Sequence, residues 1–72
     1  MSRSEAKRIL AGLEPFEEII FDFKGVVTVG QGFVDEIFRV FAQRNPKKKL
    51  TVMSTSESVE FMIRRANKAE ER

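Results

Sequence analysis

The segment Glu18–Phe41, EIIFDFKGVVTVGQGFVDEIFRVF, decides the fold because its apolar period changes within it from strand-like to helical. Its first six residues are rich in Ile and Phe and end before a Lys-Gly pair, which is typical of a strand. Alternate residues would share one face of that strand, namely Ile19, Phe21 and Phe23. Because Ile20 is also apolar and lies on the other face, we expect a central strand covered on two sides.

The second half of the segment has the period of a helix, which we expect to run from about Gln31 to Arg44. Its apolar stripe comprises Phe33, Val34, Ile37, Phe38 and Phe41. The following Asn45-Pro46 is a stop signal, because proline cannot continue a helix. Glycines at positions 25, 30 and 32 predict a turn between the strand and this helix.

Ahead of the strand, the N-terminal residues predict a further helix. Ser2 and Glu5 fit a capping box, in which each side chain accepts a hydrogen bond from a backbone N–H at the helix start. We expect this helix over residues 3–13, with Pro15 ending it.

Beyond the central helix, Lys49–Met53 is typical of a second strand, with Leu50 and Val52 on one face. Ser54 and Glu57 fit another capping box and predict a third helix. Its inward side would carry Val59, Met62, Ile63 and Ala66.

The predicted order is therefore α-β-α-β-α, and the fold class is α/β in a single domain spanning residues 1–72. Strands joined by a helix are expected to be parallel with a right-handed crossover. A two-stranded parallel sheet is a poor independent sheet. We therefore expect either that strands are missing on the N-terminal side or that a second copy of the chain completes the sheet.

The composition limits the chemistry that the chain can perform. Its 72 residues include no cysteine and no histidine, which excludes disulfides and the usual general base and thiol nucleophile. We expect no enzyme, no cofactor and no metal site. No apolar run approaches the roughly 18 residues of a membrane span, and the polar N-terminus differs from a signal peptide, so we expect a cytoplasmic protein.

The charge is unevenly placed along the chain. Residues 1–45 carry six basic and seven acidic side chains, whereas residues 46–72 carry seven basic and four acidic ones. The lysine run at positions 47–49, together with Arg64 and Arg65, could form a patch for nucleic acid. No aromatic residue is interleaved with the lysines, so stacking on bases is unsupported and nucleic acid is the weakest of the partner hypotheses.

The motifs LEPF at 13–16, IIFDFKGV at 19–26 and VGQGFVDEIFRVF at 29–41 resemble the bacterial STAS-like domain family of unknown function. SRSEAKR at 2–8 and MIRRA at 62–66 fit the same family, so the resemblance covers nearly the whole chain. That family is similar to the STAS domains of anti-sigma factor antagonists, which have helices on one side of a mixed sheet. Family members usually have further sequence ahead of the SRS segment, which fits the expectation of missing strands.

The resemblance also implies a function. In the antagonists, a strand with a central Asp leads to a turn at a helix start, where a kinase phosphorylates a hydroxyl. Asp22 matches that strand residue, but the phosphoacceptor position falls on Gly32, which has no hydroxyl. The resemblance therefore implies a docking shape without the phosphoswitch, and a histidine-kinase-type ATPase domain is the partner that it suggests.

The glycine turn has two further interpretations. Gly25 and Gly30 have the spacing of a P-loop, but the Lys and the hydroxyl that follow in that motif are absent. The dinucleotide pattern fails as well, because Asp35 occupies the position of its third glycine. Free amides at the helix start could still bind an anion or a nucleotide, which is the alternative to a plain turn.

We expect the chain to act as a non-enzymatic regulatory or signalling module, in transcription regulation, that binds a partner protein or a second copy. The predicted partner-binding residues are Gly30, Gln31, Gly32, Phe33, Asp35, Glu36 and Arg39. Asp35 and Arg39 would form an ion pair four residues apart, on a solvated helix face or on a polar recognition edge.

Three further side chains complete the expectations. Asp22 lies in an apolar strand and is expected to accept hydrogen bonds from the turn amides. Thr28 is the hydroxyl nearest the turn and a weak candidate for phosphorylation. Phe61 lies off the stripe of its helix and is a candidate partner contact.

Overall fold

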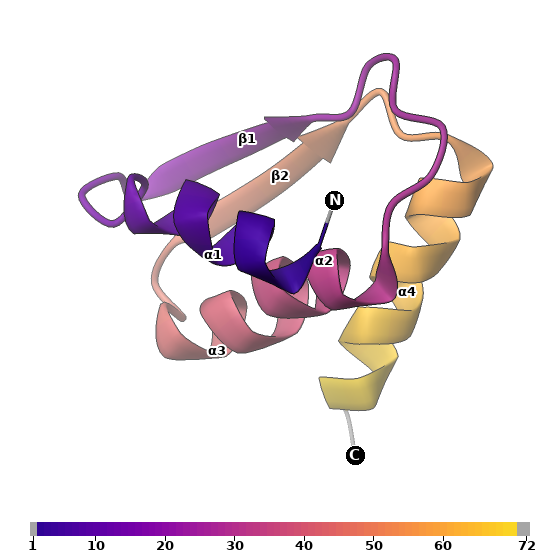
Figure 1. The fold of residues 1–72 in the computed structure, drawn as a ribbon. Coiled ribbons are helices and arrows are strands. Elements are labelled where there is room, and N and C mark those ends of the chain that lie inside the picture. Colours follow the sequence, from indigo (N-terminus) through magenta and orange to yellow (C-terminus); the bar gives the residue numbers. More distant parts are fainter. Residues whose placement is uncertain (1, 71–72) are drawn as a thin grey trace.

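The computed structural model describes residues 2–70, with side chains as far as residue 67, and has the expected α-β-α-β-α order (Figure 1). Its elements are α1 (Arg3–Ala11), β1 (Glu18–Asp22), α2 (Gln31–Asp35), η1 (Glu36–Phe41), α3 (Ala42–Arg44), β2 (Lys49–Met53) and α4 (Glu57–Glu70). The backbone stays helical from α2 through η1 to α3, so these three elements form one central helix. Within it, η1 is a π-helical segment that no sequence pattern predicted.

The helix α1 begins as its capping box predicts. Ser2 Oγ accepts from the Glu5 N–H at 3.3 Å, and the Glu5 carboxylate accepts from the Ser2 N–H at 2.9 Å. The helix ends at Ala11, two residues before the expected end at Leu13, because Gly12 closes the last turn by donating to the Ile9 carbonyl.

The two strands form a parallel pair, as predicted, in which Glu18 lies beside Lys49 and Asp22 beside Met53. The helices lie on one side of this sheet (Figure 1). On that side Ile19 and Phe23 are buried. Ile20 faces the other way and is 59% exposed, so the expected cover on two sides is wrong. Among residues 2–70 the chain has no element left to place over the outer face.

The turn after β1 is fixed by two hydrogen bonds and one glycine. Asp22 Oδ1 accepts from the Lys24 N–H at 2.9 Å, which confirms the expected turn contact, although Asp22 is exposed rather than buried. The Val26 N–H donates to the Phe23 carbonyl at 2.9 Å. Between them Gly25 has a φ of 83°, a left-handed conformation that glycine adopts at little cost.

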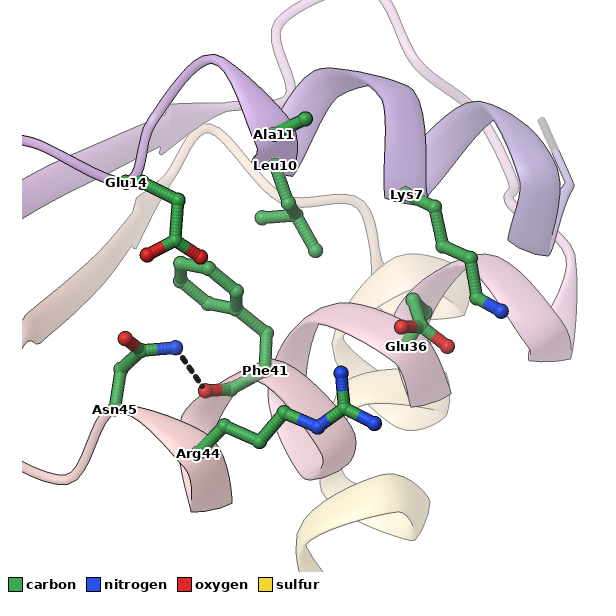
Figure 2. Close-up of a pocket in the computed structure, with 8 residues that line it drawn as sticks. All are labelled: Lys7, Leu10, Ala11, Glu14, Glu36, Phe41, Arg44 and Asn45. Atoms are coloured by element: carbon green, nitrogen blue, oxygen red, sulfur yellow. Dashed lines mark hydrogen bonds between the residues drawn. The ribbon is translucent and has the colours of Figure 1, made fainter.

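The central helix ends where the sequence predicted, at Arg44. Asn45 closes this end, because its side-chain amide donates to the Phe41 carbonyl at 2.9 Å (Figure 2). The chain then turns at Pro46 and enters β2.

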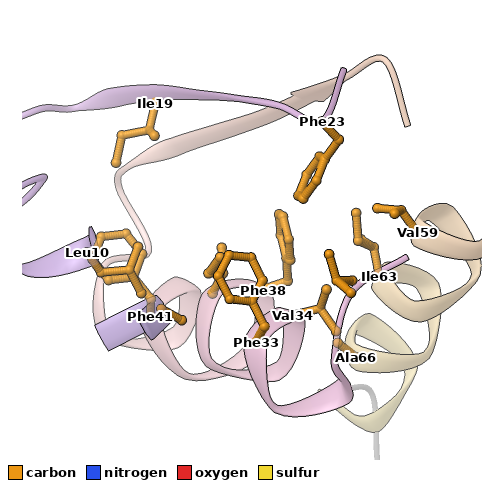
Figure 3. Packing of buried hydrophobic residues seen from close by; sticks show 13 residues of the cluster. Leu10, Ile19, Phe23, Phe33, Val34, Phe38, Phe41, Val59, Ile63 and Ala66 are labelled. Atoms are coloured by element: carbon orange, nitrogen blue, oxygen red, sulfur yellow. The ribbon is translucent and has the colours of Figure 1, made fainter. Parts of the chain in front are cut away.

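The core forms around the apolar stripe of the central helix (Figure 3). All five predicted stripe residues are buried: Phe33, Val34, Ile37, Phe38 and Phe41. The ring of Phe38 meets Phe21 of β1 edge to face, with centroids 5.6 Å apart. The helix α4 adds three buried side chains from its predicted inward face, Val59, Ile63 and Ala66.

The start of α4 differs from the expectation. Ser56, not Ser54, is the capping residue, since its Oγ accepts from the Val59 N–H at 3.1 Å. Ser56 Oγ also donates to the Val27 carbonyl at 2.7 Å, so the cap joins α4 to the loop before the central helix. Ser54 has a φ of 59° and lies in the bend between β2 and α4.

Among the described residues, no helix is long and apolar enough to cross a membrane.

The reassigned cap can be tested with two matched serine variants. Ser56→Ala should lower the free energy of unfolding by about 0.5–2 kcal/mol, because it removes the capping hydrogen bond. Ser54→Ala should change it by less than about 0.5 kcal/mol. Urea titration followed by circular dichroism measures both, and an equal loss in the two variants would contradict the assignment.

Candidate functional site

The predicted partner-binding residues gather at the start of the central helix. Gly30 is its N-terminal cap, with an extended backbone, and its carbonyl accepts from the N–H groups of Phe33 and Val34. Gly30 and Gln31 are exposed, whereas Phe33 points into the core. The turn therefore presents mainly backbone and the Gln31 side chain to solvent.

The loop at residues 26–30 is held in place by α4 and by the core. Ser56 binds the Val27 carbonyl, and the hydroxyls of Thr28 and Ser58 lie 3.1 Å apart in a hydrogen bond. Val29 is buried in the core, yet Val27, two residues earlier, is 76% exposed. An anchored loop thus displays an apolar side chain beside the glycine turn.

A cluster of four charges joins the central helix to α1: Asp35, Glu36 and Arg39 come from the central helix, and Arg3 comes from α1. Arg39 Nη2 donates to Asp35 Oδ2 at 2.8 Å, and its Nε donates to the other carboxylate oxygen, so the predicted pair is present and bidentate. Arg3 of α1 joins both acids, with Nη2 at 3.0 Å from Asp35 and Nη1 at 2.9 Å from Glu36. The pairing of Arg3 with these acids was not predicted.

This cluster is less solvated than the sequence suggested. The Glu36 side chain is 8% exposed and that of Asp35 is 14% exposed. The expectation of a solvated face is therefore wrong for these two acids. Arg3 explains why they are tolerated, since a carboxylate removed from water needs a charged or hydrogen-bonding partner.

The same arrangement shifts the titration of Asp35. Its pKa is lowered, chiefly because Arg39 donates hydrogen bonds to the carboxylate and then because Arg3 does so as well. Partial burial opposes the shift without reversing it.

Gly32 lies directly beneath the start of α1. A β-carbon added there would meet the Arg3 β-carbon at 3.4 Å, an ordinary van der Waals contact, so α1 packs directly against the central helix at this position. Gly32 is the position at which, from the sequence, we expect the phosphoacceptor of the anti-sigma antagonists to fall. Here it is covered on one side by Arg3.

The cavity of about 470 Å³ between α1 and the end of the central helix brings together residues from separate parts of the sequence (Figure 2). Its floor is apolar, from Leu10 and Phe41. The Glu36 carboxylate lies between the side chains of Lys7 and Arg44 (Figure 2). Because two acids and two bases line the cavity, their charges balance and favour neither an anion nor a cation; its lining residues are Lys7, Leu10, Ala11, Glu14, Glu36, Phe41, Arg44 and Asn45.

One lysine of the run is held by hydrogen bonds within the chain, and a second lies at the edge of ion-pair distance from an acid. Lys48 Nζ donates to the carbonyls of Glu14 and Phe16, at 2.6 Å each, and Lys49 Nζ lies 3.9 Å from Glu18. The start of β2 and the helix α4 lie on opposite sides of the domain in Figure 1, so the fold does not bring the lysines together with Arg64 and Arg65.

Those two arginines pair along α4. Arg64 is 3.7 Å from Glu60, and the Arg65 guanidinium lies 5.8 Å from the centroid of the Phe61 ring. Phe61 is exposed, as expected from its position off the apolar stripe.

Comparison with known proteins adds the family. The model of the STAS-like domain of unknown function (DUF4325) matches residues 5–60. This match covers most of the chain, and the chain belongs to that family, which confirms the resemblance seen in its motifs. Neither a curated protein nor a solved structure matched the chain.

The two arginines should affect the Asp35 titration unequally. Arg39→Gln should raise the pKa of Asp35 more than Arg3→Gln does, because Arg39 makes the larger contribution to lowering it. The carboxyl ¹³C shift of Asp35, followed by NMR against pH, measures both changes. A larger rise in Arg3→Gln would contradict this order.

The lowered pKa of Asp35 also predicts a pH dependence of stability. Its stabilising contribution should be complete above the unfolded value of about 3.9 and disappear as the pH falls through the lower folded value. Wild-type protein should therefore lose stability more steeply below about pH 4 than Asp35→Asn does. Urea titrations across this range measure the difference, and identical slopes would argue against the lowered pKa.

Proposed function

We propose that this STAS-like domain is a non-enzymatic regulatory module that binds a partner protein at the glycine-turn surface, defined as Val27, Thr28, Gly30, Gln31 and the exposed part of Arg39. This definition keeps the exposed members of the predicted site. The other predicted residues contribute indirectly. Asp35 and Glu36 pair with Arg3, Gly32 contacts α1, and Phe33 is buried in the core.

The observation that carries the proposal is the exposure of Val27 on an anchored loop. Val27 is 76% exposed, although Ser56 binds its carbonyl and Val29, two residues further on, is buried. An exposed apolar side chain on a fixed loop loses little conformational entropy when a partner covers it. Single exposed apolar residues are common, but this one adjoins the glycine turn, which we propose as the docking surface by analogy with the anti-sigma factor antagonists.

The sequence supports a binding role over catalysis. With no histidine and no cysteine, the chain has neither the usual general base nor a thiol nucleophile. The partner that the resemblance suggests is a histidine-kinase-type ATPase domain. Because Gly32 has no hydroxyl, we propose that docking is not switched by phosphorylation at that position; Thr28, the nearest hydroxyl, is bonded to Ser58.

The fold and the composition are consistent with a cytoplasmic protein that acts in signalling or transcription regulation, which we include in the proposal. The lack of cysteine gives no reason to expect an oxidising compartment.

Site-specific photo-crosslinking in the source cells tests the proposal. A photoreactive phenylalanine analogue at Val27 should form an adduct with one partner protein. The same analogue at Phe61, which is similarly exposed on α4, is the matched control and should not capture that protein. Mass spectrometry identifies the adducts, and capture from Phe61 but not from Val27 would contradict the proposed surface.

The identified partner then allows a quantitative test. Val27→Asp should weaken its binding about tenfold or more, since it places a charge in an apolar contact. Phe61→Asp should leave the affinity unchanged. Calorimetry on the purified pair measures both, with circular dichroism to show that each variant is folded.

A further inference from the structure

The edge of β1 that faces away from β2 has main-chain groups free for pairing. The Glu17 carbonyl accepts from Lys49 at 2.8 Å and the Phe23 N–H donates to Met53 at 3.0 Å, so the odd-numbered residues of β1 face β2. The N–H and C=O groups of Glu18, Ile20 and Asp22 therefore point to the open edge. Within residues 2–70 no other strand pairs with that edge.

A groove of about 300 Å³ runs beside this edge, between α1 and β1. Ile9 and Leu13 line one side of it, and the residues of β1 and its turn line the other, with Phe33 also contributing. Apart from Asp22, every lining residue is apolar. An open strand edge next to an apolar groove is the arrangement by which sheets bind an added strand, whose alternate side chains enter the groove.

The charges along the edge select the kind of strand that fits. On the outer face β1 presents an acid, an apolar side chain and an acid, at Glu18, Ile20 and Asp22. Opposite charges placed across neighbouring strands are favourable and like charges are not. Lys49 is 3.9 Å from Glu18, but both side chains are mostly exposed and leave the carboxylate accessible.

A second copy of β1 does not meet this requirement. Antiparallel pairing centred on Ile20 would place Glu18 of one copy opposite Asp22 of the other, at both ends of the ladder. The edge therefore fits a strand of different sequence, with basic ends.

We propose that the open edge of β1 binds an extended segment of a partner protein in which three apolar residues lie between two basic ones. The segment adds a third strand to the sheet. Its basic side chains lie opposite Glu18 and Asp22, its central residue covers Ile20, and the two residues between enter the groove. This surface is separate from the glycine-turn surface and does not depend on it.

The probe is a fluorescein-labelled peptide with the core Lys-Val-Val-Val-Lys, compared with the same peptide carrying Glu at both ends. Fluorescence anisotropy should show the lysine peptide binding about tenfold more tightly than the glutamate peptide. Equal binding of the two peptides, or no binding of the lysine peptide, would overturn the proposal.

Two proline variants locate the binding edge. Ile20→Pro removes an N–H that points to the open edge of β1 and should abolish peptide binding. Val52→Pro removes an N–H that points to the far edge of β2 and should retain it, which makes it the matched control. If Val52→Pro lost binding and Ile20→Pro retained it, the peptide would bind at the far edge of β2, which would overturn the proposal.

Hydrogen exchange on the unmodified domain keeps the test independent of whether the proline variants fold. The lysine peptide should slow exchange of the Ile20 and Asp22 amides by about tenfold and leave those of Leu50 and Val52 unchanged. Protection of the β2 edge instead would contradict the assignment.

Light scattering tests whether a second copy of the chain occupies the edge. A dimer that Ile20→Pro dissociates would mean that it does, which would overturn the proposal of a partner strand.

Discussion

The apolar stripe of the central helix is the surface against which the sheet, α1 and α4 all pack. Val34 and Ile37 are essentially inaccessible to water, and Phe38 meets Phe21 of β1 ring to ring. A chain of 72 residues has few side chains for a core, and burial of each large one stabilises by about 1.5–3 kcal/mol. Among the described residues, the central helix supplies more buried apolar side chains to the core than any other element.

This constraint also positions the candidate sites. Because the stripe begins at Phe33, the residues just before it must leave the core, and the glycine turn is presented at the surface. Because the helices pack on one side of the sheet, the outer face and the open edge of β1 stay uncovered within the described residues. The two proposed surfaces thus arise from one packing arrangement.

The charge cluster explains how α1 is held on the central helix. The Glu36 side chain is only 8% exposed, and a carboxylate in that position would be costly without Arg3. The two helices are also in close contact at Gly32, where an added β-carbon would lie 3.4 Å from that of Arg3. The helix α1 therefore packs beside the glycine turn, and ion pairs form part of its contact with the central helix.

The sequence predicted those features that depend on neighbours close along the chain. The five-residue stripe, the capping box of Ser2 and Glu5, the stop after Arg44 and the pair of Asp35 with Arg39 were all predicted from spacings of five residues or fewer, and the structure contains each of them. The capping residue of α4 was predicted wrongly because Ser54 and Ser56 both lie just before this helix and either serine could cap it. Only the packing of the loop against Ser56 distinguishes them.

The sequence by itself determined the order of the elements and the family, because local periodicity and motifs carry that information. The tertiary structure alone decided that Arg3 binds acids 32 and 33 residues away, that Val27 is exposed between anchored neighbours, and that Ile20 faces solvent. Each of these depends on which faces meet in space. No pattern within one element records that, because a helix or strand shows which of its faces is apolar but not what will cover it.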